Sequence, residues 1–223
     1  MAEEPIESVR IMVVEDHSSF RQALAHMLDL EPGFSVVAEA GTLAEARKRS
    51  KEKPDVAIVD MALPDGEGTE LIRELHKSGD RVTALVLSGS LSRRQYARAV
   101  EAGAAGVMHK TSSIEEIVDA VRRLKAGESL LSLDEVVALF RDVGQEREQN
   151  RDAKQAVESL SQREREVLSA LAEGLDSREI AERLNITVDT ERSHFIRIFA
   201  KLGVHSRLQA LVFAVRHGIV EIH

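Results

Sequence analysis

The sequence predicts an α/β fold followed by a smaller all-α domain: a (βα)5 doubly wound parallel sheet, then four helices that include a helix-turn-helix. Two observations predict this division. Up to about residue 126, short apolar runs rich in β-branched residues alternate with longer amphipathic stretches, whereas from Leu160 onward the pattern is helical throughout. The 223 residues are enough for two hydrophobic cores of ordinary size.

Five apolar runs predict the strands, because buried parallel strands are nearly continuous in branched apolar residues. The runs are Val9–Val14, Phe34–Ala38, Val56–Val59, Val82–Leu87 and Gly106–Met108. Amphipathic stretches between them predict five helices, with N-caps at Thr42, Ser92 and Ser113. These helices are expected at Ser18–Leu30, Leu43–Lys53, Gly68–Lys77, Arg93–Ala102 and Ile114–Lys125. We expect the strand order 2-1-3-4-5, in which strands one and three flank the point where the order reverses.

Capping residues and glycines delimit the four helices of the second domain. Ser161 and Glu164 have the spacing of a capping box, and Thr187 can cap a longer third helix that runs to Leu202. The other expected helix starts are Asp176 and Ser206, and the expected stops are Gly174, Gly203 and Gly218. A short second helix, a tight turn and a longer third helix together predict a helix-turn-helix.

The predicted boundaries are 1–127 for the sheet domain, 128–157 for a helical linker and 158–223 for the helix-turn-helix domain. Ser132–Val143 can form a helix with an apolar face, and the polar run Gln145–Gln155 is either a linker or an exposed helical connector. The acidic segment Met1–Arg10 does not resemble a signal peptide, and no apolar run approaches the roughly 18 residues that cross a bilayer. We therefore expect a cytoplasmic protein without membrane contacts.

Composition limits the kinds of site that the chain can build. The absence of cysteine excludes disulfides and thiolate metal sites, and the net charge of −8 argues against indiscriminate binding to polyanions. From residue 158 onward there are 9 Lys and Arg and 10 Asp and Glu, against 21 and 28 in the rest of the chain. A nucleic-acid-binding face in this nearly neutral second domain must therefore come from a local basic cluster.

Polar side chains follow the ends of the predicted strands. Glu15 and Asp16 follow the first strand, and the third, fourth and fifth strands are followed by Asp60, Ser88 and Lys110. Because the carboxyl ends of parallel strands meet at one edge of the sheet, we expect these side chains to converge there.

These residue types suit phosphoryl acceptance. Clustered carboxylates repel one another, and a hard cation such as Mg²⁺ relieves the repulsion. A carboxylate beside Mg²⁺ can attack phosphorus and form an acyl phosphate, while an ammonium group and a hydroxyl stabilise the transferred group. Singly, each residue has a structural alternative: Asp16 can cap a helix, Asp60 can belong to a turn, and Lys110 can be a surface lysine. Their joint placement at the strand ends favours a site.

The pair Glu15-Asp16, the segment Asp60–Gly68, Leu87-Ser88 and Lys110 resemble the receiver domain of bacterial response regulators over about residues 9–126. The resemblance implies that Asp60 is the phosphorylation site and that a sensor histidine kinase is the donor. It implies that Mg²⁺ is held by Glu15, Asp16, Asp60 and the backbone carbonyl of Ala62. It also implies that Lys110 pairs with the phosphoryl group and that Ser88 reorients towards it.

One position departs from the receiver pattern. Three residues before Lys110, the family usually has an aromatic residue or histidine that turns inward on activation, and this chain has Val107. Tyr96 is the candidate substitute for this relay, although a surface aromatic is the simpler interpretation. His109 is expected at the surface.

The third helix of the second domain combines a core-facing apolar stripe with a local basic set. The basic set, together with the following turn, comprises Arg192, His194, Arg197, Lys201, His205 and Arg207. Such residues can meet phosphates and base edges, and a solvated helix face is the alternative.

Four segments of this domain resemble the LuxR-type domain of the NarL/FixJ response regulators over about residues 158–219. They are Leu160–Leu168, Ala172–Gly174, Glu179–Leu184 and Lys201–Arg207. The resemblance implies that Val188–Leu202 is the recognition helix, with Arg192 and Ser193 facing bases and His194, Arg197 and Lys201 as backbone or flanking contacts. The last helix resembles the family's dimer-forming element through Leu208, Leu211, Val212 and Val215, and core packing of the same residues is compatible with this role.

Glu191 departs from the LuxR-type pattern, which usually has valine there. The residue belongs to the apolar face, where a carboxylate is costly unless it is paired. We expect Glu191 to be partly exposed or paired, with Arg178 or Arg183 as candidate partners, and we expect Glu191→Val to stabilise the domain.

The sequence therefore predicts a two-component response regulator rather than an enzyme. Phosphorylation of Asp60 by a histidine kinase would control homodimerisation and binding to double-stranded promoter DNA. The alternative is a receiver-controlled interaction protein that no longer binds DNA, which Glu191 and the neutral second domain motivate. A phosphohydrolase is disfavoured because such enzymes usually need a second acid two residues after the nucleophile, where this chain has Ala62.

Overall fold

The structure is a computed structural model that describes residues 8–77, 82–90, 92–128, 130 and 150–220. The chain divides into two compact units, Met1–Lys125 and Ala126–His223. Among the described residues no single helix is long and apolar enough to cross a membrane. Helices α10 (Val188–Leu202) and α11 (Arg207–Arg216), bent by 55° at the break between them, would qualify together by length and composition only.

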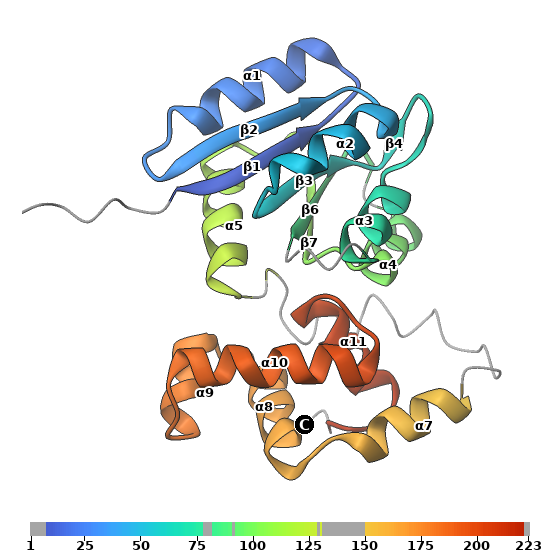
Figure 1. Ribbon diagram of the computed structural model, residues 1–223, viewed down its shortest axis with the longest axis vertical. Helices are drawn as coiled ribbons and strands as arrows, with labels where there is room; N and C mark the ends of the chain where they lie inside the picture. The colour runs from blue at the N-terminus through green and yellow to red at the C-terminus, as the bar shows by residue number, and fades with distance from the viewer. Residues whose placement is uncertain (1–7, 78–81, 91, 129, 131–149, 221–223) are drawn as a thin grey trace, which may run out of the picture. The chain divides into compact units, whose positions relative to one another are not determined.

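The first unit is built on a five-stranded parallel sheet in the order β2-β1-β3-β6-β7 (Figure 1). Its strands are β1 (Val9–Val14), β2 (Phe34–Ala40), β3 (Val56–Asp60), β6 (Thr83–Ser88) and β7 (Gly106–His109). The predicted order 2-1-3-4-5 of the five main strands is therefore confirmed. The order reverses between β1 and β3, so the carboxyl ends of these neighbouring strands meet at the switch point.

Helices cover both faces of the sheet, as the doubly wound prediction requires. They are α1 (Ser18–Asp29), α2 (Leu43–Arg49), α3 (Gly68–Lys77), α4 (Arg93–Ala102) and α5 (Ile114–Ala126). Alternate strand residues, including Met12 and Val59, pack with α2, α3 and α4 in one buried cluster, and α1 and α5 cover the other face (Figure 1). Thr42, Ser92 and Ser113 accept the expected N-capping hydrogen bonds.

Two local details differ from the prediction. Helix α2 ends at Arg49 rather than Lys53, and it is followed by the 3-10 helix η1 (Ser50–Glu52) and by Lys53 in the left-handed region (φ 50°). The loop after β3 contains a small antiparallel ladder, β4 (Ala62–Leu63) with β5 (Gly66–Glu67), that short apolar runs do not reveal. The predicted helix at 132–143 lies outside the described residues.

The second unit is helical, as predicted. It contains α7 (Asn150–Ser159), α8 (Gln162–Ala172), α9 (Ser177–Arg183), α10 and α11. Ser161 and Glu164 form the predicted capping box, Thr187 caps α10, and Gly203 ends α10 in the left-handed region (φ 65°). The segment Gln145–Gln155 was expected to be either a linker or an exposed helical connector. Its residues from Asn150 onward are helical, since α7 begins there. Helix α10 packs against α8, α9 and α11.

Candidate phosphoacceptor site and nucleic-acid interface

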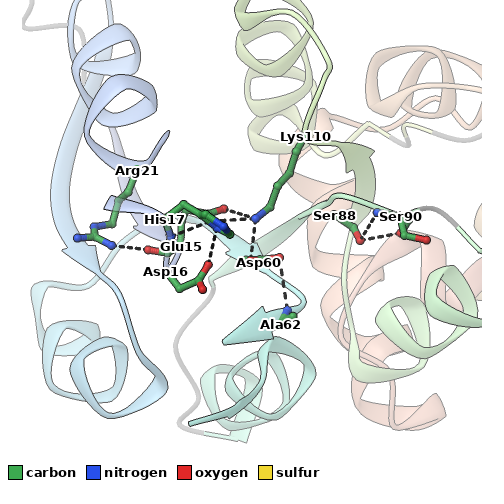
Figure 2. A network of polar contacts seen from close by, with 9 residues as sticks. All are labelled: Glu15, Asp16, His17, Arg21, Asp60, Ala62, Ser88, Ser90 and Lys110. Atoms are coloured by element: carbon green, nitrogen blue, oxygen red, sulfur yellow. Dashed lines mark hydrogen bonds and ion pairs between the residues drawn. The ribbon is translucent and has the colours of Figure 1, made fainter. Parts of the chain in front are cut away.

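Four of the five predicted strand-end side chains, those of Glu15, Asp16, Asp60 and Lys110, gather in one charged cluster, the acidic pocket (Figure 2). Asp60 is the last residue of β3 and is 6% exposed, and Glu15, which follows β1, is 2% exposed. Lys110 follows β7 and reaches both: its Nζ lies 2.8 Å from Asp60 Oδ2 and 2.6 Å from Glu15 Oε2. Asp60 and Glu15, which precede Lys110 by 50 and 95 residues in the sequence, therefore meet around its ammonium group.

Lys110 is held in place by more than its two ion pairs. Its backbone N–H donates to Ser88 O at 2.9 Å, and its ammonium group lies 5.8 Å from the centre of the Phe20 ring. Burial alone would lower the pKa of Lys110, but the hydrogen bonds and charges of Asp60 and Glu15 outweigh burial and raise it. The side chain therefore carries a fixed positive charge at the phosphoacceptor.

Asp16 and His17 complete the acidic side of the pocket (Figure 2). Asp16 does not cap α1, because the N-cap residue is His17. The His17 side chain makes no capping hydrogen bond either. The His17 ring instead places Nδ1 2.9 Å from Glu15 Oε1 and 2.8 Å from Asp16 Oδ1. The hydrogen bond to Glu15 and the two carboxylate charges raise the pKa of His17.

The pKa of Asp16 is lowered. Burial opposes this shift, but the contact with Glu15 and the charges of His17 and Lys110 outweigh it. Sequence reasoning missed His17, although its position directly after Glu15-Asp16 was the available signal.

The donor set fits Mg²⁺. Glu15, Asp16, His17 and Asp60 offer ligand atoms that all lie within 4.8 Å of one another. Three of the four are carboxylates, the hard oxygen ligands that Mg²⁺ prefers. Ala62 is exposed beside them, and its N–H lies 3.4 Å from Asp60 Oδ1, so its backbone belongs to the same rim. One lysine near three carboxylates leaves negative charge for a cation to balance.

The loop after Asp60 is held by two residues of the predicted motif. Gly68 begins α3 so close to β3 that a Cβ there would lie 2.0 Å from Asp60 O, so only glycine fits. Asp65 caps the distant helix α2, accepting from Leu43 N at 2.7 Å and Ala44 N at 2.9 Å. These bonds lower the pKa of Asp65. The sequence analysis assigned this segment to the receiver motif, with turn chemistry as the alternative, and did not predict the cap.

Ser88 lies at the predicted strand end but is turned into its own loop. It is 4% exposed, and its hydroxyl donates to Ser90 O at 2.6 Å and accepts from Ser90 N at 3.2 Å (Figure 2). Val107 is partly buried against the core cluster. Tyr96 is 8% exposed, so the expectation of a surface aromatic was wrong: α4 packs this ring inward.

The predicted nucleic-acid residues are unequally available on α10. Arg192, Ser193 and Arg197 are exposed. Lys201 is engaged within the unit, donating to Glu164 Oε2 at 2.7 Å and to Ser159 O at 2.9 Å. His194 is half-buried, and burial followed by the charges of Arg197 and Arg163 lowers its pKa, so it can offer a hydrogen bond but not a charge at neutral pH.

Glu191 is paired, but with neither of the expected partners. The residue is 0% exposed, and its Oε1 accepts from Arg207 Nη2 at 2.6 Å. The Arg207 guanidinium also lies 3.8 Å from the centre of the Phe195 ring. The expectation that Glu191 is either partly exposed or paired is therefore confirmed by its second alternative, whereas the choice of Arg178 or Arg183 as the partner was wrong; Arg183 pairs with Glu173 instead. Because its side chain is only 11% exposed, Arg207 does not belong to a free basic set.

The predicted dimer residues of α11 lie mainly in the domain core. Leu208, Leu211 and Val212 are buried, whereas Val215 is half-buried. The core-packing interpretation therefore holds for three of the four, and the exposed part of α11 remains for any contact with a second copy.

Two family models match this chain. The response regulator receiver domain matches residues 11–122, and the bacterial regulatory proteins of the luxR family match residues 158–214. The DNA-binding transcriptional activator DevR/DosR of Mycobacterium tuberculosis is 36% identical over 207 residues, covering 92% of this chain and 94% of that protein. The response regulator VraR of Staphylococcus aureus is 30% identical over 217 residues, covering 96% of this chain and 100% of that protein.

Solved structures of response regulators are also similar to this chain. The response regulator ChrA of a heme-sensing two-component system matches with a TM-score of 0.50 and 31% identity, covering 96% of this chain and 99% of that one. The signal receiver domain of NarL from Mycobacterium tuberculosis matches with a TM-score of 0.53 and 32% identity, covering 55% of this chain and 99% of that one. DevR/DosR is a DNA-binding transcriptional activator, and this similarity does not favour a protein that has lost DNA binding. The chain therefore belongs to the response regulators that join a receiver domain to a LuxR-type DNA-binding domain and regulate transcription.

Proposed function

We propose that a sensor histidine kinase phosphorylates Asp60 in the presence of Mg²⁺, and that phosphorylation controls homodimerisation and promoter binding by the helical domain. The observation that carries this proposal is the Lys110 ammonium group, which lies 2.8 Å from Asp60 Oδ2 beside two further carboxylates. We place these events in the cytoplasm, the compartment that holds promoter DNA in bacteria.

In the proposed reaction the Asp60 carboxylate attacks the phosphorus of a phosphohistidine. The new O–P bond forms as the N–P bond breaks, and the electron pair of that bond returns to the donor imidazole. Lys110 neutralises charge on the transferring oxygens. Glu15, Asp16, Asp60 and the Ala62 carbonyl would hold Mg²⁺, which when bound supplies further positive charge for the same oxygens.

In the phosphorylated protein, the phosphoryl group on Asp60 would compete with the carboxylates of Asp60 and Glu15 for the Lys110 ammonium group. The ammonium group now bonds to Asp60 and Glu15, and a phosphoryl oxygen on Asp60 offers it a stronger partner. Ser88 would exchange its two bonds to Ser90 for a bond to the phosphoryl group, which would move the loop after β6. This movement is the proposed route from chemistry to dimerisation.

The helical domain would bind DNA through α10, with Arg192 and Ser193 at base edges and Arg197 at the backbone. His194 and Lys201 would be flanking contacts, and Lys201 would have to leave Glu164 to reach a phosphate. The less buried side of α11, including the half-buried Val215, would contact a second copy, so that two α10 helices read a two-part site.

The experiment combines three readouts on the full chain. The protein is incubated with a small-molecule phosphodonor and Mg²⁺, and its intact mass, oligomer size and binding to selected DNA duplexes are measured. Wild type is expected to gain one phosphoryl group, to form more dimer and to bind DNA at least tenfold more tightly, the ~1.4 kcal/mol that a modest allosteric coupling supplies. Asp60→Asn is expected to show none of these changes.

Asp65→Asn is the matched control, because it alters a carboxylate of the same loop that does not reach the pocket. It is expected to behave as wild type. If Asp60→Asn gained mass, or bound DNA as tightly as phosphorylated wild type, the proposed switch would be wrong.

A further inference from the structure

The outward face of α10 carries an apolar strip between two arginines. The buried face of the helix is formed by Glu191, Phe195, Ile198 and Leu202. At 3.6 residues per turn, the opposite face contains Ser193, Ile196 and Ala200, all of which are exposed. The exposed residues Arg192 and Arg197 flank this strip.

Two polar side chains near Ile196 make contacts within the helix. The Ser193 hydroxyl donates to Asp189 O at 2.8 Å, so its proton is used within the helix. Arg192 Nη1 lies 3.7 Å from Asp189 Oδ1, which directs it towards the start of the helix. The middle of the outward face is thus left to the side chains of Ile196 and Ala200.

Ile196 is 44% exposed, and it is one of three large hydrophobic side chains that the described part of the chain leaves exposed. The other two, Met27 and Leu30, lie at the end of α1 in the receiver unit. Single exposed apolar residues are ordinary on protein surfaces. Ile196 differs because it lies at the centre of the helix face that the proposed function directs into the major groove.

The major groove presents one apolar group, the 5-methyl of thymine. A β-branched side chain in a helix has one strongly preferred rotamer, so Ile196 can present its methyl groups without losing further freedom on binding. We propose that Ile196 is a specificity-determining residue that packs on a thymine methyl and selects T over the other bases at one position of each half-site. This inference rests on the proposed entry of α10 into the major groove.

The test removes the proposed contact first from the DNA, by deleting the thymine methyl, and then from the protein, by shortening Ile196. DNA duplexes are first selected from a random pool with the phosphorylated full chain, and single thymines of the enriched site are then replaced by deoxyuridine, which lacks only the methyl. Wild type is expected to lose about fourfold in affinity for each contacted methyl, the factor that corresponds to one buried carbon. Ile196→Ala is expected to bind the thymine site about as weakly as wild type binds the deoxyuridine site, and to be indifferent to the replacement.

Met27→Ala removes an equally exposed apolar side chain, 44% exposed, from the other unit and is expected to keep the wild-type response. Ile196→Ala is expected to melt at the wild-type temperature, because the side chain is on the outside of its helix. An enriched site that no deoxyuridine replacement weakens, or an Ile196→Ala variant that keeps the wild-type sensitivity, would overturn this inference alone. A selection that enriches no sequence would overturn the proposed DNA binding, and this inference with it.

Discussion

In the receiver unit, Lys110 lies between Glu15 and Asp60 while Asp16 adds a third carboxylate, whereas in the described part of the helical unit each buried carboxylate has a cation of its own. Glu191 pairs with Arg207, and Glu164 pairs with Lys201. Both units therefore bury charge, but among the buried groups that the structure describes, only those of the pocket have more negative than fixed positive charges. The difference separates a ligand site from structural ion pairs: excess charge is tolerated where a cation or phosphoryl group balances it, and matched charge holds elements together.

The largest expected effect tests whether the Glu191–Arg207 pair is structural. Sequence reasoning expected Glu191→Val to stabilise the domain, but the contact with Arg207 reverses the expected sign. The single substitution leaves a guanidinium buried without its partner, so we expect the free energy of unfolding to fall by about 3–5 kcal/mol. Chemical denaturation followed by circular dichroism measures it.

The double variant Glu191→Val with Arg207→Met is expected to recover most of this loss, because hydrophobic replacement of a whole buried pair is often neutral. Arg183→Met is the matched control, since its pair with Glu173 is exposed and should contribute less than about 1 kcal/mol. A Glu191→Val protein as stable as wild type would show that the pair does not hold α10 to α11.

The next effect tests the excess charge of the receiver pocket. Mg²⁺ at about 100 times its dissociation constant is expected to raise the free energy of unfolding of the receiver unit by about 2.7 kcal/mol, and EDTA to remove this gain. The chain has one tyrosine and no tryptophan, and Tyr96 is buried in the receiver unit, so tyrosine fluorescence follows this unit selectively.

Asp16→Asn is expected to abolish the response to Mg²⁺ and, in EDTA, to be at least as stable as wild type because one repelling charge is gone. The unfolding of the helical unit should not respond to Mg²⁺. If Asp16→Asn kept the full response, Asp16 would not be a ligand.

A smaller effect depends on pH and concerns Glu164. Burial opposes ionisation, but the hydrogen bonds from Lys201 and from the Ser161 N–H outweigh it and lower the pKa of Glu164 from its ordinary value. A carboxyl whose pKa is lower in the folded state stabilises the protein above its unfolded pKa, and this stabilisation is lost as pH falls through the folded value. Glu164→Gln is therefore expected to cost about 1–3 kcal/mol at pH 7, and this difference from wild type should shrink below about pH 4.5.

Thermal denaturation of both proteins between pH 3 and 7 measures this difference. Glu166→Gln, which breaks the exposed pair with Arg163, is expected to stay within about 1 kcal/mol of wild type. A difference between wild type and Glu164→Gln that stayed constant over this pH range would contradict the assignment.

The smallest effect concerns Asp65, a carboxylate that is close to the pocket residues in sequence but whose oxygens already accept two backbone hydrogen bonds. Asp65→Ala removes two hydrogen bonds to the start of α2 and is expected to cost about 1 kcal/mol, as other N-cap losses do. The stabilisation by Mg²⁺ should be unchanged in this variant. A lost Mg²⁺ response would place Asp65 in the pocket and weaken the distinction between excess and matched charge.

Local patterns were sufficient to predict most of the fold. Apolar runs and capping residues predicted each of the five main strands and the helices from α1 to α5, because strand and helix periodicity and N-caps are encoded within a few neighbouring residues. The miss at the end of α2 and the unpredicted β4–β5 ladder are short elements with too few residues for a period to show.

The sequence by itself determined the main elements, the gathering of Glu15, Asp60 and Lys110 at one edge, and the family resemblance, because parallel strands bring their carboxyl ends together whatever lies between them. Only the tertiary structure decided the partner of Glu191, the turn of His17 towards two carboxylates, the cap that Asp65 provides and the burial of Tyr96. Each of these depends on how separate elements pack or on the rotamer of one side chain. A few ångströms decide such contacts, and residue periodicity carries no information at that scale.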